Sequence, residues 1–285
     1  MNTSSPSRRR LQSPSMLATC FVLALALTGC GDVASDGASA KAAVKLTAPP
    51  NLVHARTLTL CSDIGYPPME FDDHGRPTGA DIEIGTHLAH LMGVKVQFEG
   101  TPFDDIIPAV RAHKCDAAIS SLTRTKERSK LVAFVDYLKG GQSLMVQTSN
   151  PTNIETLDDL AGKRVSVQDG TTNEDFLRTR SFGSDGSPTI RAFAKDTDAT
   201  EALKRGEVDA YFGDSPVVAY HIGQEALTYA FAGKPINPEP IGIALDHRSH
   251  SLKSELQRGI DAMYADGSMA KILRKWKLDD FALHG

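Results

Sequence analysis

The sequence predicts an α/β protein built from two similar halves, each a mainly parallel sheet flanked by helices. One short pattern occurs twice: residues 110–117 have the sequence VRAHKCDA and lead to Ser121, and residues 203–210 have the sequence LKRGEVDA and lead to Asp214. Each copy is typical of a helix end that feeds a buried parallel strand, with a polar residue where the strand stops. Ligands of open α/β sheets bind beyond the carboxyl ends of the strands. Two such sheets facing each other would therefore place the Ser121 hydroxyl and the Asp214 carboxylate across one cleft.

Strands and helices alternate from residue 52 onward, which is the second observation behind this fold class. The first half predicts a strand at 58–61, a helix with its apolar face over 84–92, a strand at 94–98, a helix over 106–110 and a strand at 116–120. Gly93 is placed to end the first of these helices.

The same alternation restarts after Asn150 and Pro151. It predicts a short helix at 157–160, a strand at 164–167, a helix at 173–180, a strand at 189–193 and a helix at 198–205. At the C-terminus, apolar residues at helical spacing over 252–263 predict a further helix, and residues 271–277 continue as another in which Trp276 packs. About 90 residues in each half are enough for one α/β core each.

The N-terminal residues predict a targeting segment. Arg8, Arg9 and Arg10 precede an apolar stretch over 16–27 that is too short to span a bilayer as a stable helix. The stretch ends in LTGC at 27–30, which resembles a bacterial lipobox, so we expect a signal peptide over 1–29 and lipidation of Cys30. Several acyl chains on this cysteine would anchor the protein to a membrane. Residues 31–51, rich in Ala, Gly and Ser, predict a flexible tether.

Charge and composition narrow the class of partner. Removal of the three N-terminal arginines leaves 28 Lys and Arg against 35 Asp and Glu, so the mature domain is acidic. No block of basic residues is present to meet phosphates, which disfavours nucleic acid as a partner. Cys61 and Cys115 are the two cysteines left for the folded domain. Cys61 is expected near the end of its strand and Cys115 at the start of another. Parallel neighbouring strands would leave several residue rises between them, so we expect two buried free thiols and no disulfide.

A set of ordered motifs resembles the extracellular solute-binding proteins of the polar amino-acid uptake family, which serve ATP-driven importers. The matching stretches are DIGYPPMEF at 63–71, GADIE at 79–83, SSLTRTKER at 120–128, GKRV at 162–165, GTT at 170–172, residues 209–214, and DG at 266–267 through KW at 275–276. The resemblance covers about residues 58–278. It implies a two-lobed fold with two crossover strands as a hinge, the first lobe over 52–139 and 241–285 and the second over 143–237.

The resemblance also implies how an amino acid would be held. A buried zwitterion needs a partner for each charge. Arg128 corresponds to the residue that grips the ligand carboxylate with its planar fork, assisted by Thr123 and Thr172. Asp214 and Ser121 correspond to the acceptors of the ammonium group.

The remaining candidate residues would surround the ligand side chain. Tyr66 and Phe103 resemble the aromatic walls of the family, and Ser120 and Asn173 could supply neutral polar contacts. Asp63 matches the acid that reaches the far end of the side chain in the histidine-binding and lysine/arginine/ornithine-binding members. We therefore expect a monomeric receptor that captures a polar, and in particular a basic, L-amino acid by lobe closure and delivers it to a membrane permease.

Two other functions fit the same scaffold. Some members are cyclohexadienyl (arogenate or prephenate) dehydratases, for which Glu174 is the one proton donor that the sequence offers. A sensory amino-acid receptor subunit is the other alternative. The histidine pairs at 87 and 90 and at 247 and 250 have no converging ligands in the sequence, so we expect no metal site and no cofactor.

Overall fold

The structure is a computed structural model and describes residues 44–183 and 186–284. The predicted signal peptide and Cys30 lie outside these residues. None of the helices in the described part is long and apolar enough to cross a membrane.

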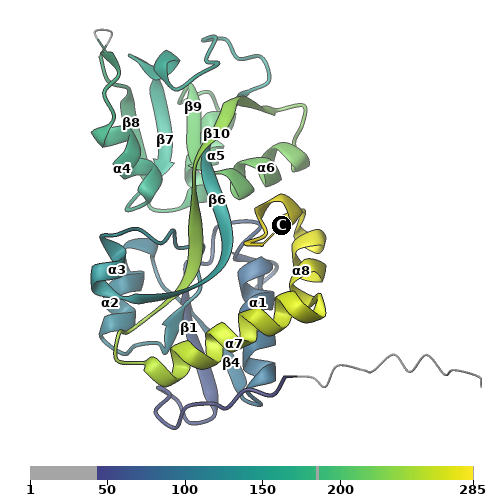
Figure 1. Cartoon of the computed structure of the whole chain (residues 1–285). Helices are drawn as coiled ribbons and strands as arrows, with labels where there is room; N and C mark the ends of the chain where they lie inside the picture. The colour runs from purple at the N-terminus through teal and green to yellow at the C-terminus, as the bar shows by residue number, and fades with distance from the viewer. Residues whose placement is uncertain (1–43, 184–185, 285) are drawn as a thin grey trace, which may run out of the picture. The chain divides into compact units, whose positions relative to one another are not determined.

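Two long antiparallel strands form the centre of an eight-stranded sheet with the order β4-β1-β5-β10-β6-β9-β7-β8. These are β6 (Ala133–Gln147) and β10 (Tyr229–Leu245), and both run from one lobe to the other (Figure 1). On each side of this pair lie three parallel strands, so the sheet is nearly symmetric about its centre. The predicted α/β fold with two lobes and two crossover strands is therefore confirmed.

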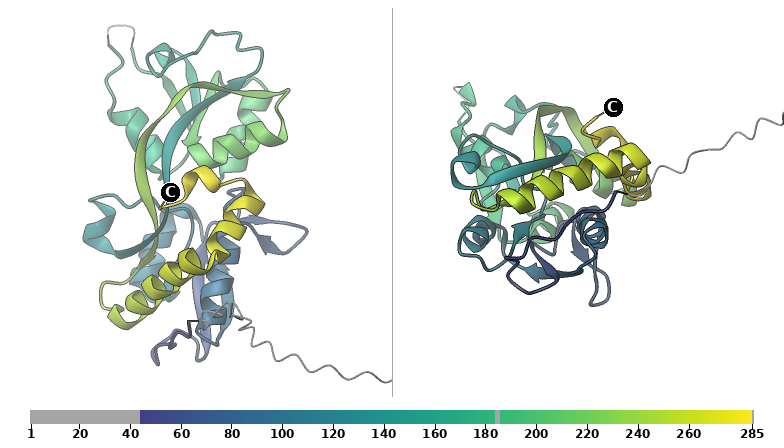
Figure 2. Two further views of the ribbon diagram at one scale, coloured as in Figure 1. Left: turned by 45° about the vertical axis from the view of Figure 1, so that its right-hand side comes forward. Right: turned by 60° about the horizontal axis from the view of Figure 1, so that its bottom comes forward.

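The first lobe contains the triad β5-β1-β4 and the helices around it. Its elements are β1 (Thr57–Ser62), β2 (Phe71–Asp72), β3 (Pro77–Thr78), α1 (Ala80–Leu91), β4 (Lys95–Gly100), η1 (Phe103–Asp105), α2 (Ile106–Arg111), β5 (Ala117–Ala118), α3 (Arg128–Leu131), α7 (His250–Asp266), α8 (Ser268–Trp276) and η4 (Asp279–Phe281). Side chains alternate between the two faces of a strand. Leu58 and Leu60 of β1 accordingly pack with α1, α7 and α8, whereas Cys61 packs with α2 on the opposite face. Figure 2 shows the yellow helices α7 and α8 against the blue elements of this lobe.

The second lobe repeats this arrangement with the triad β9-β7-β8. Its elements are η2 (Asp158–Leu160), β7 (Arg164–Gln168), α4 (Thr172–Thr179), β8 (Thr189–Phe193), α5 (Asp196–Lys204), β9 (Ala210–Asp214) and α6 (Ser215–Gln224). One apolar cluster joins β7 to α4, and another joins α5 and α6 to the opposite face of the sheet.

The duplicated pattern occupies equivalent places in the two lobes. Ala118 of β5 pairs with Ala244 of β10, and Asp214 of β9 pairs with Gln142 of β6. Each triad thus meets the crossover pair through the strand that the pattern predicted. Ser121 follows β5 by three residues in a left-handed conformation (φ 47°), and Asp214 ends β9. Both residues lie at the carboxyl ends of parallel strands, as predicted.

The predicted tether extends too far along the chain. Leu46 is 2% exposed, its N–H donates to the Leu91 carbonyl (3.0 Å), and its side chain packs in the core of the first lobe. Pro49 is buried as well. The alanine- and proline-rich composition of this stretch concealed one apolar residue that anchors it to α1.

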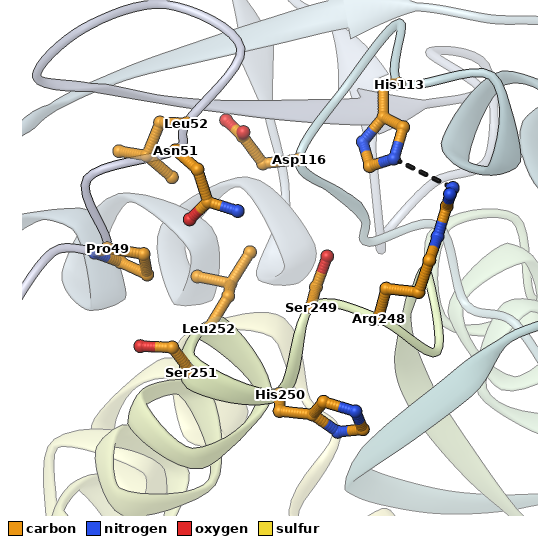
Figure 3. A pocket seen from close by; sticks show the side chains of 10 residues that line it. All are labelled: Pro49, Asn51, Leu52, His113, Asp116, Arg248, Ser249, His250, Ser251 and Leu252. Carbon is orange, nitrogen blue, oxygen red and sulfur yellow. Dashed lines mark hydrogen bonds between the residues drawn. The ribbon is translucent and has the colours of Figure 1, made fainter.

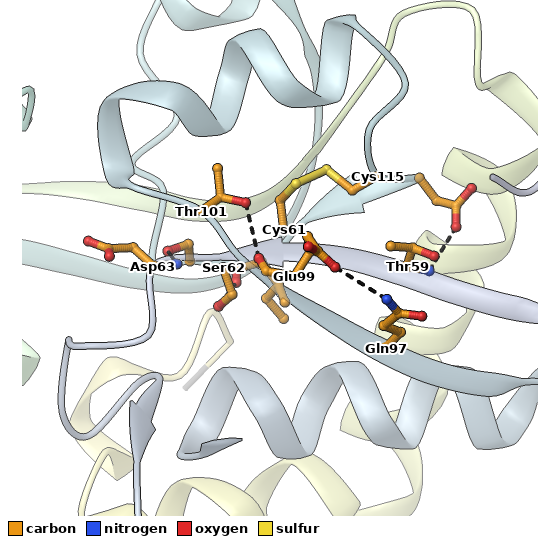
Figure 4. Close-up of a disulfide and its surroundings, with 11 residues drawn as sticks. Thr59, Cys61, Ser62, Asp63, Gln97, Glu99, Thr101 and Cys115 are labelled. Atoms are coloured by element: carbon orange, nitrogen blue, oxygen red, sulfur yellow. Dashed lines mark hydrogen bonds between the residues drawn. A yellow bond between two sulfur atoms is a disulfide. The ribbon is translucent and has the colours of Figure 1, made fainter. Parts of the chain in front are cut away.

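The expectation of free thiols is wrong, because Cys61 and Cys115 form a disulfide (Figure 4). The prediction placed Cys115 on an extended strand, but β5 begins only at Ala117, and residues 114–116 form a bend after α2. This bend carries Cys115 into the layer between α2 and the sheet, and its Cα lies 5.8 Å from that of Cys61. Asp116 holds the bend by accepting hydrogen bonds from the Val53 and Thr59 N–H groups at 2.7 Å each.

The disulfide closes a loop with a sequence separation of 54 and should stabilise the fold. Loop-closure entropy predicts a loss of up to about 4 kcal/mol in the free energy of unfolding when the bond is reduced. Denaturant unfolding of the soluble domain with and without reductant measures this difference. Mass spectrometry of the denatured, unreduced domain should find the peptides of both cysteines cross-linked. Two alkylated thiols without reductant would contradict the assignment.

Candidate functional site

The sequence-predicted site residues gather at the carboxyl ends of the strands of both lobes. From the first lobe come Asp63 after β1, Tyr66 in the next loop, Phe103 at the start of η1, Ser120, Ser121 and Thr123 after β5, and Arg128 at the start of α3; from the second lobe come Thr172 and Asn173 at the start of α4 and Asp214 at the end of β9. Cys30 lies outside the described residues.

Asp214 is the centre of a buried polar cluster that joins the lobes. It is 8% exposed, and its Oδ1 accepts a hydrogen bond from Asn173 Nδ2 at 2.9 Å. The Tyr66 hydroxyl from the first lobe also hydrogen-bonds to it. Burial raises the pKa of Asp214, and the hydrogen bonds from Asn173 and Tyr66 lower it only in part. A carboxylate in such a place gains from a cationic partner.

Two buried acceptors among the predicted site residues receive no donor from the described residues. They are Ser121 Oγ and Asn173 Oδ1, on side chains 3% exposed in both cases. The backbone N–H of Ser121, by contrast, donates to Asp81 Oδ2 at 2.8 Å. Buried polar atoms normally have hydrogen-bond partners, so two such acceptors at the carboxyl ends of β5 and β9 point to a ligand that carries several donors.

Arg128 contacts both lobes. Its Nη1 donates to the Thr123 carbonyl (3.2 Å), and its Nη2 donates to the Gly170 carbonyl of the second lobe (3.3 Å). Its guanidinium lies 5.3 Å from the centroid of the Phe103 ring, within reach of a cation–π interaction. Burial lowers the pKa of Arg128, and the nearby Asp214 opposes this effect most strongly. The side chain remains a cation within the protein.

Asp63 forms a second bridge between the lobes. Its Oδ2 accepts a hydrogen bond from Gln168 Nε2 of β7 at 2.6 Å, and its N–H donates to Ser120 Oγ at 3.0 Å. Burial raises the pKa of Asp63, the Gln168 hydrogen bond lowers it, and the charge of Asp196 raises it again. Asp63 is therefore a partly desolvated carboxylate at the junction of the lobes.

A glycine permits the closest approach of the lobes. Gly170 has φ +69°, and a Cβ on it would overlap the Asp104 carboxylate of η1. A residue with a side chain would displace the Asp104 carboxylate from this contact. At the same place the Gly170 carbonyl accepts a hydrogen bond from Arg128.

Thr172 lies at the edge of the site. With Arg128, Gln142 and Asn237 it lines an open pocket of about 430 Å³ that also contains Asp175 and Glu239. Thr172 has no hydrogen bond to Arg128, so its part in carboxylate binding stays a prediction.

Glu174 is poorly suited to donate a proton. Burial acts to raise its pKa, but the Gly170 N–H (2.9 Å) and Arg178 (2.6 Å) lower the pKa overall. The Glu174 carboxylate is thus favoured over the protonated acid, and it pairs with Arg178 of the same helix. Both features disfavour the dehydratase alternative.

A separate pocket of about 60 Å³ lies at the start of α7, away from these residues (Figure 3). Arg248, whose Nη2 lies 3.1 Å from His113 Nε2, forms one wall of it. None of the predicted site residues lines this pocket. Across residues 44–183 and 186–284, no three histidines, cysteines or carboxylates converge as a metal site would require.

Sequence reasoning missed three residues of the site. Gln168 ends β7, so the rule that identified Asp214 at the end of β9 could have found it as well. Glu70 and Asp81 lie buried behind Ser120 and Ser121 and contact the site only through them. Their position depends on tertiary packing of the loop before α1, for which the sequence offers no periodic signal.

Comparisons with known proteins agree with this architecture. Residues 58–279 match the family model of bacterial extracellular solute-binding proteins, family 3. The L-cystine-binding protein TcyJ of Escherichia coli (strain K12) is 29% identical over 213 residues, which are 74% of this chain and 79% of the relative. The histidine-binding periplasmic protein of the same strain is 28% identical over 238 residues, covering 81% of this chain and 90% of the relative. Both relatives are binding proteins, which agrees with the prediction of a binding protein for this chain.

Solved structures show the same fold. An ancestral arginine-binding protein bound to arginine superposes with a TM-score of 0.72 at 34% identity, covering 77% of this chain and 97% of the other. An ancestral amino acid-binding protein described as a precursor of cyclohexadienyl dehydratase gives a TM-score of 0.71 at 34% identity, covering 77% and 95%. Because the family match includes both lobes and both crossover strands, the chain belongs to family 3 of the bacterial extracellular solute-binding proteins.

Proposed function

We propose that this protein is the substrate-binding receptor of an ABC importer and captures a basic L-amino acid between its lobes. The observation that carries the proposal is the pairing of a buried anion with a buried cation. Asp214 and Arg128 are close enough for each charge to affect the pKa of the other, and the predicted site residues around them include two buried acceptors without donors. A zwitterion presents the complementary pair of charges and the missing donors.

The two ends of the zwitterion have distinct partners in this proposal. The ammonium group donates to Asp214, Ser121 Oγ and Asn173 Oδ1, which together offer one carboxylate and two neutral acceptors. The carboxylate accepts from Arg128, whose planar guanidinium can hold both oxygens. Phe103 stacks on the same guanidinium and keeps it oriented.

The charge balance of the site favours a ligand with a second cation. Of the three charged residues proposed to contact the ligand, Asp63 and Asp214 are anions and Arg128 is a cation. A zwitterion without a charged side chain adds no net charge, so one of the two carboxylates would remain uncompensated. Asp196 and Asp104 add negative potential at Asp63, and Lys195 offsets part of it. A side-chain ammonium, guanidinium or imidazolium would compensate Asp63 in a site where an unpaired charge is costly. Tyr66 would flank the aliphatic part of that side chain.

The surroundings of the receptor follow from the same proposal. The relatives named above include a periplasmic protein, and a disulfide is typical of an oxidising compartment outside the cytoplasm. Signal-peptide cleavage and lipidation of Cys30 would anchor a monomer at a membrane beside its permease. A sensory receptor subunit uses the same pocket and differs only in its partner.

A thermal-shift screen of the soluble domain against the L-amino acids tests the ligand class. A ligand that binds only the folded state raises the melting temperature by mass action. We expect the largest shifts for arginine, lysine, ornithine or histidine, and no shift for glutamate or leucine. A larger shift for an acidic or aliphatic amino acid would contradict the basic ligand, and production of phenylpyruvate from prephenate would favour the enzyme alternative.

Replacement of Arg128 by alanine should remove the carboxylate partner without unfolding the domain. Loss of one member of a desolvated charge pair costs about 3 kcal/mol, which corresponds to roughly a hundredfold in Kd. Lysine should not restore affinity because it lacks the planar fork. Calorimetry with L-arginine measures the change.

Arg124 provides a matched control for Arg128. It lies in the same segment, but its guanidinium pairs with Asp136 near the surface. Arg124→Ala should therefore leave the affinity for L-arginine unchanged. Wild-type affinity in Arg128→Ala would show that Arg128 only joins the lobes through Gly170.

Replacement of Asp63 by asparagine should change ligand preference more than overall affinity. Asparagine keeps the size and can still accept the Gln168 hydrogen bond, but it removes the demand for a distal cation. We expect Kd for arginine and lysine to rise by about tenfold or more and Kd for glutamine to change by less than about threefold. The exposed neighbour Asp105→Asn controls for long-range charge effects. An equal change for all three ligands would mean that Asp63 acts only as a bridge between the lobes.

A further inference from the structure

Two acidic side chains lie buried behind the proposed ammonium site. Glu70 is 1% exposed and Asp81 is fully buried, and the proposed function gives neither of them a contact with the ligand. Glu70 belongs to the loop after β1, where its carbonyl accepts hydrogen bonds from the Gly65 and Tyr66 N–H groups. Asp81 lies in the first turn of α1. Glu70 accepts from the side chain of Ser120 and Asp81 from the backbone of Ser121, so contacts to two adjacent residues bring the two carboxyl groups together, and each affects the pKa of the other.

A hydrogen bond between two carboxyl groups requires one proton, because two carboxylates have no donor to share and repel each other. The contacts of each group indicate which of them carries this proton. Glu70 Oε2 receives no donor from the described residues, as expected for an atom that itself bears the hydrogen. Asp81 instead accepts from the Tyr137 hydroxyl (2.7 Å) and from the Ser121 N–H (2.8 Å). Its position at a helix N-terminus also favours the anion.

The pair holds both serines of the site. Glu70 Oε1 accepts a hydrogen bond from Ser120 Oγ at 2.7 Å, and Ser120 Oγ in turn accepts a hydrogen bond from the Asp63 N–H. Asp81 holds the N–H of Ser121, whose left-handed backbone is uncommon for a residue with a side chain. Tyr137 ties the same carboxylate to the crossover strand β6.

We propose that Glu70 and Asp81 share one proton, carried by Glu70, and act as the positioning pair that orients Ser121 toward the ligand ammonium and Asp63 toward its side chain. The positioning part of this proposal rests on the proposed function, whereas the shared proton does not. Neither residue touches the ligand, so both act through the serines.

The charges around the pair are consistent with a single proton. The titratable groups that face Glu70 are Asp81 and Asp63, and those that face Asp81 are Tyr137 and Glu70. None of these groups is basic. Burial and the charge of Asp81 raise the pKa of Glu70 well above its usual range, and burial raises the pKa of Asp81 to about 6.

Infrared spectroscopy of the ligand-free domain tests the shared proton directly. At neutral pH the wild-type protein should show the carbonyl band of a protonated carboxylic acid, and Glu70→Gln should remove it. The surface variant Glu99→Gln, which alters an exposed carboxylate, should leave the band unchanged. Absence of the band in the wild type, or its persistence in Glu70→Gln, would overturn the assignment.

The pH dependence of stability supplies a second readout without ligand. A carboxyl whose pKa is raised by folding binds its proton more tightly in the native state, so the free energy of unfolding falls as the pH rises from the unfolded pKa toward the folded one. Wild-type stability should therefore decline relative to that of Glu70→Gln as the pH rises above the pKa of an unfolded glutamate. Parallel pH profiles of the two proteins would overturn the shared proton.

Calorimetry with L-arginine tests the positioning role. Glu70→Gln keeps a donor for Asp81 and an acceptor for Ser120, so its Kd should stay within about threefold of the wild type. Glu70→Leu removes both and should raise Kd by at least about tenfold. Asp81→Asn directs an amide N–H₂ toward either the Ser121 N–H or the Tyr137 hydroxyl, which are both donors to Asp81, and should weaken binding similarly. Circular dichroism checks that this variant is folded.

The outcomes separate this inference from the proposed function. If the wild type binds no amino acid while the infrared band behaves as expected, the proposed function fails and the shared proton stands. If the wild type binds L-arginine and a folded Glu70→Leu binds it equally well, the positioning role fails and the proposed function stands. Tight binding in a folded Asp81→Asn together with weak binding in Glu70→Gln would reverse the assignment of the proton.

Discussion

The antiparallel pairing of β6 with β10 is the constraint on which the rest of the structure depends. Each triad of parallel strands joins this pair by its own inner strand, β5 on one side and β9 on the other. The carboxyl ends of both triads are therefore directed to the same region between the lobes. The last residues of those strands, Gln168 and Asp214, and the segments that follow other strands, with Asp63 and Ser121, thus lie at the same edge although they are distant in sequence. The crossover strands thus determine the place of the site before any side chain is considered.

Within that region the behaviour of each charge follows from its neighbours. Arg128 and Asp214 lie close enough to offset part of each other's desolvation, and neither has a direct ion-pair partner among the described residues. Other charged residues, such as Arg164 with Asp209, are paired at the surface, where such pairs contribute little to stability. The site therefore keeps its charges in a costly state, which is typical of residues retained for binding rather than for stability.

Much of the fold could be predicted because its signals are local. Periodicity located the helices and strands of both lobes, and the repeated Asp-Ala pattern placed β5 and β9. The disulfide could not be predicted in this way, since a bend of three residues before Ala117 decides whether Cys115 reaches Cys61. Leu46 was missed because a single apolar residue in a stretch rich in small residues has no period.

The candidate site shows the same division between local and tertiary information. Family motifs identified residues such as Arg128, Asp214 and Asp63, and the structure places all three at or after the carboxyl ends of strands. Glu70 and Gln168 were not identified as site residues. Gln168 could have been found from its place at the end of β7. The importance of Glu70 depends on which atom faces which neighbour, and neither spacing nor residue type contains that information.

Gly170 has a consequence for the energetics of the whole molecule. Its lack of a side chain lets the second lobe rest against Asp104, and the same peptide offers its carbonyl to Arg128. The contact belongs to the scaffold and would be the same for every ligand. The contact therefore contributes a constant amount to the free-energy difference between separated and apposed lobes, whereas the contribution of the ligand differs from one ligand to the next. If the proposed role of Asp63 holds, affinity and selectivity can evolve separately: changes at the Gly170 peptide would rescale the binding of all ligands together, and changes around Asp63 would alter their order.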